Sequence, residues 1–257
     1  MDAKAVAQAV EEFWASRAAG VPYPPAWFDR LSLEEAGRVQ LGLIRREVAG
    51  GARHVGWKVG LTAPAIREQF RVHEPVFGYL LDRGLQQTGY AVQAADWVGP
   101  GFENELCLRL RAPLRGPNVD LAAARAAVEL CFPAMELVEN RGDLSAQLAV
   151  AVADNVQQRA FVVGAPVRLA DDADLAAVTA TVRINGQQVA QATGDAVMGN
   201  PLESIVWLAN KLAAFGQGLE SGQYVMTGSF TRQFPLRAGD VAETTFAGIG
   251  TVSVRCA

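Results

Sequence analysis

The chain has 257 residues, half of them hydrophobic and 19% charged, so it can bury a sizeable core. Its formal net charge is −4 and it carries no run of Lys or Arg, which argues against a nucleic-acid surface or an anionic membrane surface. The three cysteines include no Cys-x-x-Cys pair, which argues against a disulfide framework, and two histidines are too few for a His-rich zinc site. The sequence has no apolar stretch long enough to span a membrane. We therefore expect a cytoplasmic protein.

The first fifty residues are predicted to be helical. Residues 3–18 are Ala-rich, with apolar side chains at helical spacing. A second helix is expected over residues 32–48, because Ser32 followed by Glu35 forms a capping box. Gly50-Gly51 ends it. We therefore predict a helical segment that occupies residues 1–52.

From residue 53 onward, short apolar runs alternate with glycine-rich turns. Residues 61–78 predict a brief helix and then a Pro/Gly loop over a site, and Asn185-Gly186 indicates a hairpin turn. Asn200-Pro201 opens a helix that Gly216 ends. A further helix is expected over 118–131, and strands at 55–60, 91–98, 103–111, around 136, and at 178–184, 223–229, 241–247 and 250–256.

This order of elements predicts an α+β protein with a β-rich catalytic domain over residues 53–257, continuous with the N-terminal helices. The strands are short and few helices separate them. Such a pattern is typical of a mixed, largely antiparallel barrel or sandwich.

Two acids in one predicted strand carry the strongest chemical signal. Glu103 and Glu105 are two residues apart, so their side chains project from the same face. Adjacent carboxylates are costly to bury unpaired, and such a strand either faces water or holds a cation. With Glu136 they would form an all-oxygen site suited to Mg²⁺ or Mn²⁺. Spacing alone does not choose between Glu136 and Glu139, which point to opposite faces of their strand.

Four further segments allow two interpretations each. Lys58 is either a surface lysine or a cation held near the carboxylates. His73 is either an acid–base group or a surface loop residue. Asp154-Asn155 suits a cap or turn, and Thr227-Gly228-Ser229 suits either a turn or an anion contact.

Eight segments, in order along the chain, resemble a known family. They are Lys58-Val59-Gly60-Leu61-Thr62, Val72-His73-Glu74-Pro75-Val76-Phe77-Gly78-Tyr79-Leu80, Glu103-Asn104-Glu105, Pro133-Ala134-Met135-Glu136, Ala153-Asp154-Asn155, Gly199-Asn200-Pro201, Trp207-Leu208-Ala209-Asn210, and the tail from Thr227-Gly228-Ser229 to Ala238-Gly239-Asp240. The chain is similar in these segments to the 2-keto-4-pentenoate hydratase / 4-oxalocrotonate decarboxylase family, within the fumarylacetoacetate hydrolase superfamily.

The resemblance implies the mixed β-roll or barrel of the fumarylacetoacetate hydrolase C-terminal type, with an N-terminal helical part. It implies Mg²⁺ or Mn²⁺ at Glu103, Glu105 and Glu136, and so favours Glu136 over Glu139. It also implies a homo-oligomer, able to associate with a related decarboxylase or hydratase, that acts in the meta-cleavage breakdown of aromatic compounds.

By the same resemblance, the expected reaction adds water to 2-hydroxypenta-2,4-dienoate or a close analogue and gives a 4-hydroxy-2-oxo acid. Lys58 is the first choice for a cation that contacts the substrate, and His73 or Asp154 would assist with proton transfer. Four residues are expected to contact the substrate: Lys58, Leu61, Phe77 and Ser229.

Three alternatives stay open at this point. Decarboxylation of 4-oxalocrotonate would use the same metal site, although Ser229 resembles the hydratases, which typically have serine there. A C–C hydrolase acting on acylpyruvates would use His73 and Glu74 to activate water. A non-catalytic subunit of a hydratase–decarboxylase complex is the third, and the intact set of three glutamates argues against it.

Overall fold

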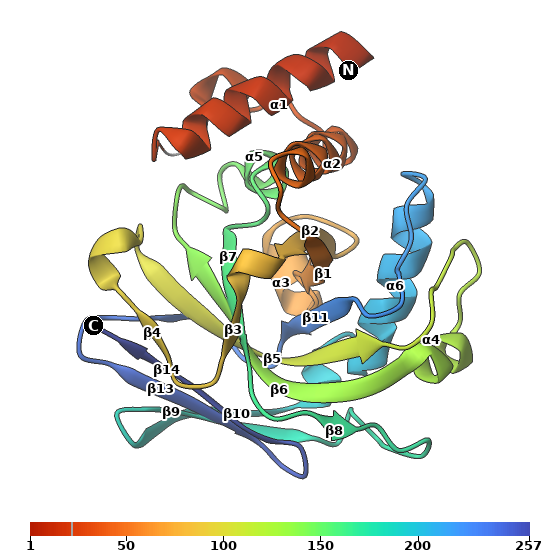
Figure 1. Ribbon diagram of the computed structural model, residues 1–257, viewed down its shortest axis with the longest axis vertical. Coiled ribbons are helices and arrows are strands. Elements are labelled where there is room, and N and C mark those ends of the chain that lie inside the picture. The colour runs from red at the N-terminus through yellow and green to blue at the C-terminus, as the bar shows by residue number, and fades with distance from the viewer. Residues whose placement is uncertain (22) are drawn as a thin grey trace.

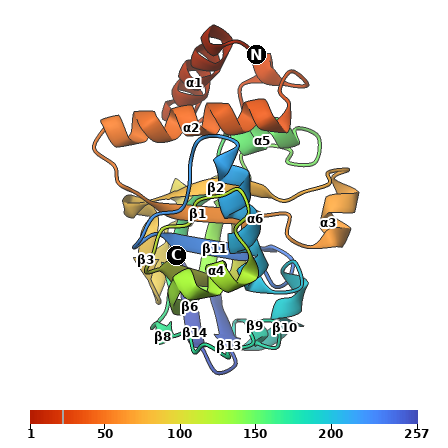
Figure 2. The same cartoon turned by 90° about the vertical axis from the view of Figure 1, so that its right-hand side faces the viewer.

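Two N-terminal helices cover one end of a β-rich body in the computed structural model, which describes residues 1–21 and 23–257. They are α1 (Ala3–Ala18) and α2 (Leu33–Ala49). The predicted capping box begins α2: the Glu35 N–H donates to Ser32 Oγ at 3.2 Å, and the Ser32 N–H donates to Glu35 Oε2 at 2.9 Å. Figure 2 shows the two helices stacked above α5 (Leu148–Ala153). Within the described residues, no helix is long and apolar enough to cross a membrane.

The larger of two sheets has nine strands in the order β2-β1-β11-β5-β6-β7-β3, with β12 paired to β5 and β8 to β6. Its pairs are antiparallel except β1–β11 and β3–β7. The bounds are β1 (His54–Gly60), β2 (Val76–Leu81), β3 (Leu85–Gln87), β5 (Pro100–Leu110), β6 (Val128–Glu139), β7 (Gln158–Val163), β8 (Val167–Arg168), β11 (Tyr224–Ser229) and β12 (Phe234–Pro235).

The second sheet has five strands in the order β10-β9-β13-β14-β4. The predicted hairpin joins β9 to β10, with Asn185 at φ 53° and Gly186 at φ 80°, as a two-residue turn of this kind requires. The bounds are β4 (Tyr90–Val92), β9 (Thr179–Ile184), β10 (Gln187–Thr193), β13 (Val241–Phe246) and β14 (Gly250–Cys256).

The remaining helices lie beside the sheets (Figures 1 and 2). They are α3 (Pro64–Gln69), α4 (Leu121–Ala127) and α6 (Pro201–Ala213), with short 3₁₀ turns η1 (Pro25–Trp27), η2 (Asp82–Gly84), η3 (Ala94–Asp96) and η4 (Gly194–Ala196). Asn200 caps α6 as predicted, because its side chain accepts the Leu202 N–H at 3.0 Å. The α+β class, with mixed sheets and N-terminal helices, is therefore confirmed, whereas the division into a segment over 1–52 and a domain over 53–257 stays a prediction.

The curved strand β5 is buried on both faces, and this places the site. Leu106 and Leu108 belong to the main core on one face. Cys107 belongs to a separate cluster on the other face, together with Phe132 of β6 and Phe161 of β7. Glu103, Glu105 and Cys107 are each two residues apart, so their side chains point to the same face of β5. The glutamates therefore lie on the face covered by this smaller cluster.

Three predicted elements are wrong in whole or in part. The loop expected at 72–78 enters β2 at Val76, because that strand pairs with β1 and is buried throughout. The helix expected over 118–131 ends at Ala127, and the next four residues begin β6. The strand expected over 91–98 is cut short by η3. At β2 and β6, pairing with a neighbouring strand outweighs the local preference of the sequence.

Candidate metal centre

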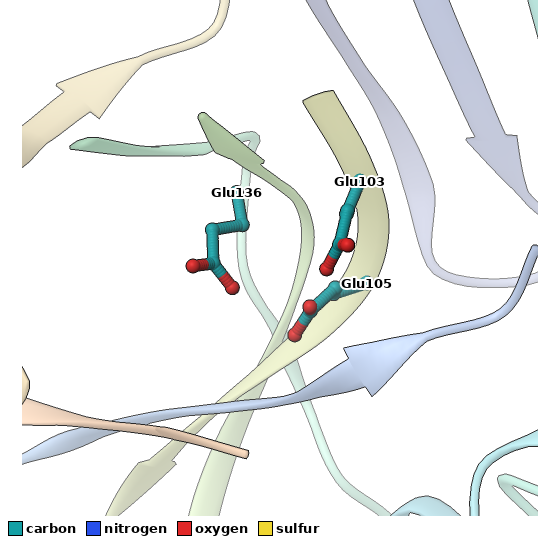
Figure 3. A group of neighbouring side chains, drawn as sticks. All are labelled: Glu103, Glu105 and Glu136. Atoms are coloured by element: carbon teal, nitrogen blue, oxygen red, sulfur yellow. The ribbon is translucent and has the colours of Figure 1, made fainter. Parts of the chain in front are cut away.

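The register of two neighbouring strands brings the three glutamates together. Glu103 of β5 lies directly opposite Glu136 of β6, and Glu105 lies opposite Ala134. One oxygen of each carboxylate lies within 4.8 Å of the others. Figure 3 shows Glu103 and Glu105 side by side on one strand and Glu136 facing them from the next.

Lys58 of β1 joins this cluster. Its side chain is 3% exposed, and its Nζ lies 3.2 Å from Glu136 Oε1. Burial lowers the pKa of Lys58, but the charges of Glu136, Glu103 and Glu105 outweigh burial, and the net pKa is raised. The ammonium therefore stays protonated, and one positive charge faces three carboxyl groups.

The carboxyl groups resist ionisation in this setting. Burial raises the pKa of Glu136 to about 7, although Lys58 opposes the rise. Burial raises the pKa of Glu105 well above its usual range, and the charges of Glu136 and Glu103 add to the effect. Burial also raises the pKa of Glu103, again against Lys58. Three buried carboxylates can all be charged here only if further positive charge balances them.

Unpaired oxygens show that the cluster fits a cation. Glu105 Oε1 and Glu136 Oε2 are buried and accept no hydrogen bond. A buried carboxylate oxygen without a partner is costly, and a divalent metal would remove that cost. The donors are all carboxylate oxygens, which are the ligands that Mg²⁺ and Mn²⁺ prefer. Within residues 1–21 and 23–257, no other group of three His, Cys, Asp or Glu residues has such geometry.

The segment Thr227-Gly228-Ser229 closes one side of the cluster. The Gly228 N–H donates to Glu105 Oε2 at 2.8 Å, which fixes that carboxylate. Gly228 has φ 112°, and a Cβ there would lie 2.5 Å from Thr62, so glycine is required. Ser229 pairs directly with Glu105 across the strands and is half-buried. The N–H of this segment thus serves a protein carboxylate rather than an external anion.

The structure places the other predicted substrate residues unevenly. Leu61 follows Gly60 at the end of β1, at φ 57°, and is half-buried. Phe77 packs edge-to-face against Trp57 and Phe215, with ring centroids 5.9 and 5.5 Å away. Gly78 lies opposite Lys58, so it shares the face of the sheet on which Lys58 meets the glutamates. Phe77 is the neighbouring residue in the strand and therefore points to the other face.

The two residues predicted to transfer protons, His73 and Asp154, form no hydrogen bond or ion pair with the three glutamates in the described structure. His73 is exposed in the segment between α3 and β2. The neighbouring Glu74 is paired with Lys211 Nζ at 2.5 Å. Asp154 is buried, and its two oxygens accept from Arg17 Nε at 2.6 Å and Arg141 Nε at 2.7 Å.

Arg17 and Arg141 also line a cavity of about 650 Å³, which none of the three glutamates lines. Most of its charged side chains are paired with one another: Glu139 pairs with Arg141 and Arg159, and Glu47 pairs with Arg83 at 2.6 Å. The cavity is therefore separate from the glutamate cluster and largely neutral.

The turn that the sequence allows at Asp154-Asn155 lies beside Lys58, a position that the sequence did not predict. Asn155, Val156 and Gln157 have φ of 67°, 50° and 62°, three left-handed residues in succession. A Cβ on Gly60 would lie 3.4 Å from Lys58 Nζ and 3.8 Å from Val156 Cγ1, which places this turn at the lysine. The only sequence signal was Asn155, because asparagine tolerates the left-handed conformation.

Comparisons with known proteins bear on this site. Residues 57–257 match the family described as fumarylacetoacetate (FAA) hydrolase C-terminal. The chain is 34% identical to 2-hydroxyhexa-2,4-dienoate hydratase of Comamonas testosteroni, over 88% of this chain and 86% of that protein. It is 32% identical to 2-oxo-hept-4-ene-1,7-dioate hydratase of Escherichia coli, over 93% and 90%.

A solved structure is similar throughout. It is 4-oxalocrotonate decarboxylase from Pseudomonas putida G7, complexed with magnesium and adipate. The TM-score is 0.94 at 30% sequence identity, and the alignment covers 100% of this chain and 99% of that one. The similarity includes the N-terminal helices, which lie outside the family match over 57–257.

Proposed function

The chain belongs to the fumarylacetoacetate hydrolase family, and on that premise we propose that it is a metal-dependent hydro-lyase. It adds water to a 2-hydroxy-2,4-dienoic acid, 2-hydroxypenta-2,4-dienoate or a close analogue, and gives a 4-hydroxy-2-oxo acid in the breakdown of aromatic compounds. The observation that carries this proposal is the cluster of Glu103, Glu105 and Glu136, in which Glu105 and Glu136 are buried with unpaired oxygens and Lys58 lies beside them. Relatives named as hydratases act on substrates of this class.

The three glutamates would hold a divalent cation, Mg²⁺ or Mn²⁺. When bound there, such an ion supplies Lewis acidity that stabilises negative charge on a substrate oxygen. The Gly228 N–H orients Glu105, so that its free oxygen Oε1 is available to the ion. Lys58, protonated in its buried position, is placed to donate a hydrogen bond to an anionic substrate group.

Roles in proton transfer remain proposals. Asp154 has both oxygens engaged by arginines, which favours a structural role for it over proton transfer. His73 is exposed and free of such a network, so it keeps its place as a candidate if the segment that carries it approaches bound substrate. Leu61 and Ser229 keep theirs as substrate contacts by their positions next to Gly60 and Glu105.

Decarboxylation of 4-oxalocrotonate is the second candidate, because the structural similarity to that enzyme extends over the whole chain. Both reactions need charge stabilised on an oxygen of a 2-oxo acid, so the metal site does not separate them. Ser229, which resembles the hydratases, favours water addition.

Product analysis tests the proposal. The purified protein with Mg²⁺ or Mn²⁺ is incubated separately with 2-hydroxypenta-2,4-dienoate, 4-oxalocrotonate and an acylpyruvate, and the products are followed by NMR. We expect water addition to the dienoate. Release of CO₂ from oxalocrotonate as the faster reaction would replace the hydratase by the decarboxylase, and cleavage into two acids would replace both.

Self-association is a further prediction that follows from the resemblance. We expect a homo-oligomer, and we expect that a related decarboxylase or hydratase can join it. Size-exclusion chromatography with light scattering measures the first, and co-elution with such an enzyme measures the second.

A further inference from the structure

The turn at residues 155–157 is held in a costly conformation. Three successive left-handed residues without a glycine are unfavourable, because the Cβ of an L-residue crowds the following carbonyl oxygen in this conformation. Val156 is the most unfavourable of them, because a β-branched side chain crowds the backbone there. Such a conformation persists only where its surroundings enforce it, and it is found at functional sites.

Asn155 supplies the main restraint. Its Oδ1 accepts the Tyr79 N–H at 2.7 Å, and its Nδ2 donates to the Tyr79 carbonyl at 3.0 Å and to Gln158 Oε1 at 3.1 Å. The side chain is buried, with 3% of the residue exposed. Tyr79 lies in β2, an edge strand of the larger sheet. The carboxamide of Asn155 therefore bonds backbone groups of Tyr79 that a neighbouring strand would otherwise pair.

A second buried amide restrains the same edge. Gln40 of α2 donates through Nε2 to the Phe77 carbonyl of β2 at 2.9 Å and to the Val152 carbonyl of α5 at 2.8 Å. Together the two amides tie the end of α5 and the following turn to β2. The turn therefore cannot move away from β2 without breaking buried hydrogen bonds.

The same carboxamide lies against the lysine of the site. Gly78 is the cross-strand partner of Lys58. A Cβ on Gly78 would lie 2.9 Å from Asn155 Oδ1 and 3.0 and 3.1 Å from Lys58 Cγ and Cε. The lysine side chain thus runs over the bare backbone of Gly78, past the asparagine, to reach Glu136.

We propose that Asn155 is a positioning residue for this site: its carboxamide fixes the left-handed turn beside Lys58 and so directs the lysine ammonium to Glu136. The proposal rests on the proposed function, in which Lys58 contacts the substrate. It assigns Asn155 no contact with metal or substrate, because its polar atoms are occupied by Tyr79 and Gln158.

The principal test is Asn155→Gly, which keeps the turn conformation accessible and removes only the carboxamide. The matched control is Asn185→Gly. Asn185 is also left-handed, at φ 53°, and its amide makes two hydrogen bonds, to Asp240 and Val241, against three for Asn155, but it lies in a hairpin of the other sheet. Both variants are compared for kcat, KM, Mn²⁺ affinity and melting temperature.

We expect Asn155→Gly to lower kcat about 100-fold, as a misplaced reacting group does, while the Mn²⁺ dissociation constant stays unchanged. Asn185→Gly should keep its kcat even where its melting temperature falls. A kcat for Asn155→Gly equal to that of the control would overturn the proposal. So would a matching loss of Mn²⁺ affinity, since that would show general damage to the site.

A second variant and a structure keep the outcome decisive. If Asn155→Gly does not fold, Gly78→Ala is the second variant, because the added Cβ forces the asparagine and the lysine apart. It should give the same loss of kcat with Mn²⁺ affinity intact, and a normal kcat in Gly78→Ala would contradict the proposal.

If the wild-type protein hydrates no dienoate, the proposed function fails but the positioning does not. In that case a crystal structure of either variant decides: Lys58 Nζ still 3.2 Å from Glu136 Oε1 rejects the proposal.

Discussion

Two clusters of charge lie at opposite faces of β6, and only in one of them are the carboxylates satisfied by partners within the chain. Glu139 accepts the Val98 N–H at 3.0 Å and pairs with Arg141 and Arg159, so both of its oxygens are satisfied. By contrast, Oε1 of Glu136 is paired with a single cation, Lys58, and Oε2 has no hydrogen-bond partner.

The difference separates a structural cluster from a functional one. In the arginine cluster, both acids find their partners within the chain: Glu139 and Asp154 are paired with Arg17, Arg141 and Arg159. In the glutamate cluster, three acids share one lysine, and the deficit is of the sign and size that a divalent cation supplies. The predictions below test this contrast by disturbing one cluster and then the other.

Glu103→Gln should have the largest effect. It keeps the size of the side chain but removes one of the three negative charges that hold the metal. Because loss of groups that merely support metal ligands already costs 10–100-fold, we expect activity to fall by more than about 100-fold, with weaker Mn²⁺ binding. Enzyme assay and Mn²⁺ titration check this, and circular dichroism confirms the fold. Full activity in this variant would show that Glu103 is not a ligand.

Lys58→Met should separate metal binding from catalysis. Methionine keeps most of the volume of the buried side chain but not its charge. Activity should fall about 100-fold, the usual effect of removing one electrostatic group, while Mn²⁺ binding is kept, because the competing positive charge is gone. Steady-state kinetics and Mn²⁺ titration measure both. Loss of metal binding together with activity would mean that Lys58 supports the glutamates rather than the substrate.

These predictions concern residues that the sequence revealed to different degrees. Glu103 and Glu105 were identifiable because strand alternation alone places two acids side by side. Glu136 and Glu139 were not distinguishable by spacing, since both occupy a buried apolar strand. The family resemblance favoured Glu136, and the structure shows the physical reason: the register of β5 against β6 places Glu136 opposite Glu103, whereas Glu139 is paired with arginines.

The fold shows the same division. The beginnings of α2 and α6 and the β9–β10 turn were predicted correctly, because a few adjacent residues determine each of them. Pro75 and Gly78 predict a loop over 72–78, yet residues 76–78 begin β2, where the absence of a side chain at Gly78 leaves room for Lys58. At Asp154-Asn155 the sequence predicts a cap or turn, but three successive left-handed residues could not be foreseen, because hydrogen bonds to the distant residue Tyr79 hold them.

Glu139→Gln should affect stability instead of activity. The exchange leaves Arg141 and Arg159 without their carboxylate partner in a largely buried network. We expect a loss of about 3 kcal/mol in the free energy of unfolding, at the lower end for a broken buried pair because Arg159 is partly exposed. Urea denaturation measures it. Mn²⁺ affinity should be unchanged, and a clear decrease in it would contradict the separation of the two clusters.

The smallest effect is on the pH dependence of stabilisation by metal. In the metal-free protein the pKa of Glu136 is about 7, above the ordinary value of 4.5, because the group is buried. Between these values the folded state binds more protons than the unfolded state, so the contribution of this group to the free energy of unfolding falls as pH rises.

Metal binding requires the ionised carboxylates, so the rise in melting temperature on adding Mg²⁺ should be greater at about pH 8 than at about pH 5.5. Thermal unfolding with EDTA and with Mg²⁺ at both pH values measures this. Glu139→Gln should keep the difference and Glu103→Gln should reduce it, whereas an equal rise at both pH values would mean that the buried glutamates do not bind the ion.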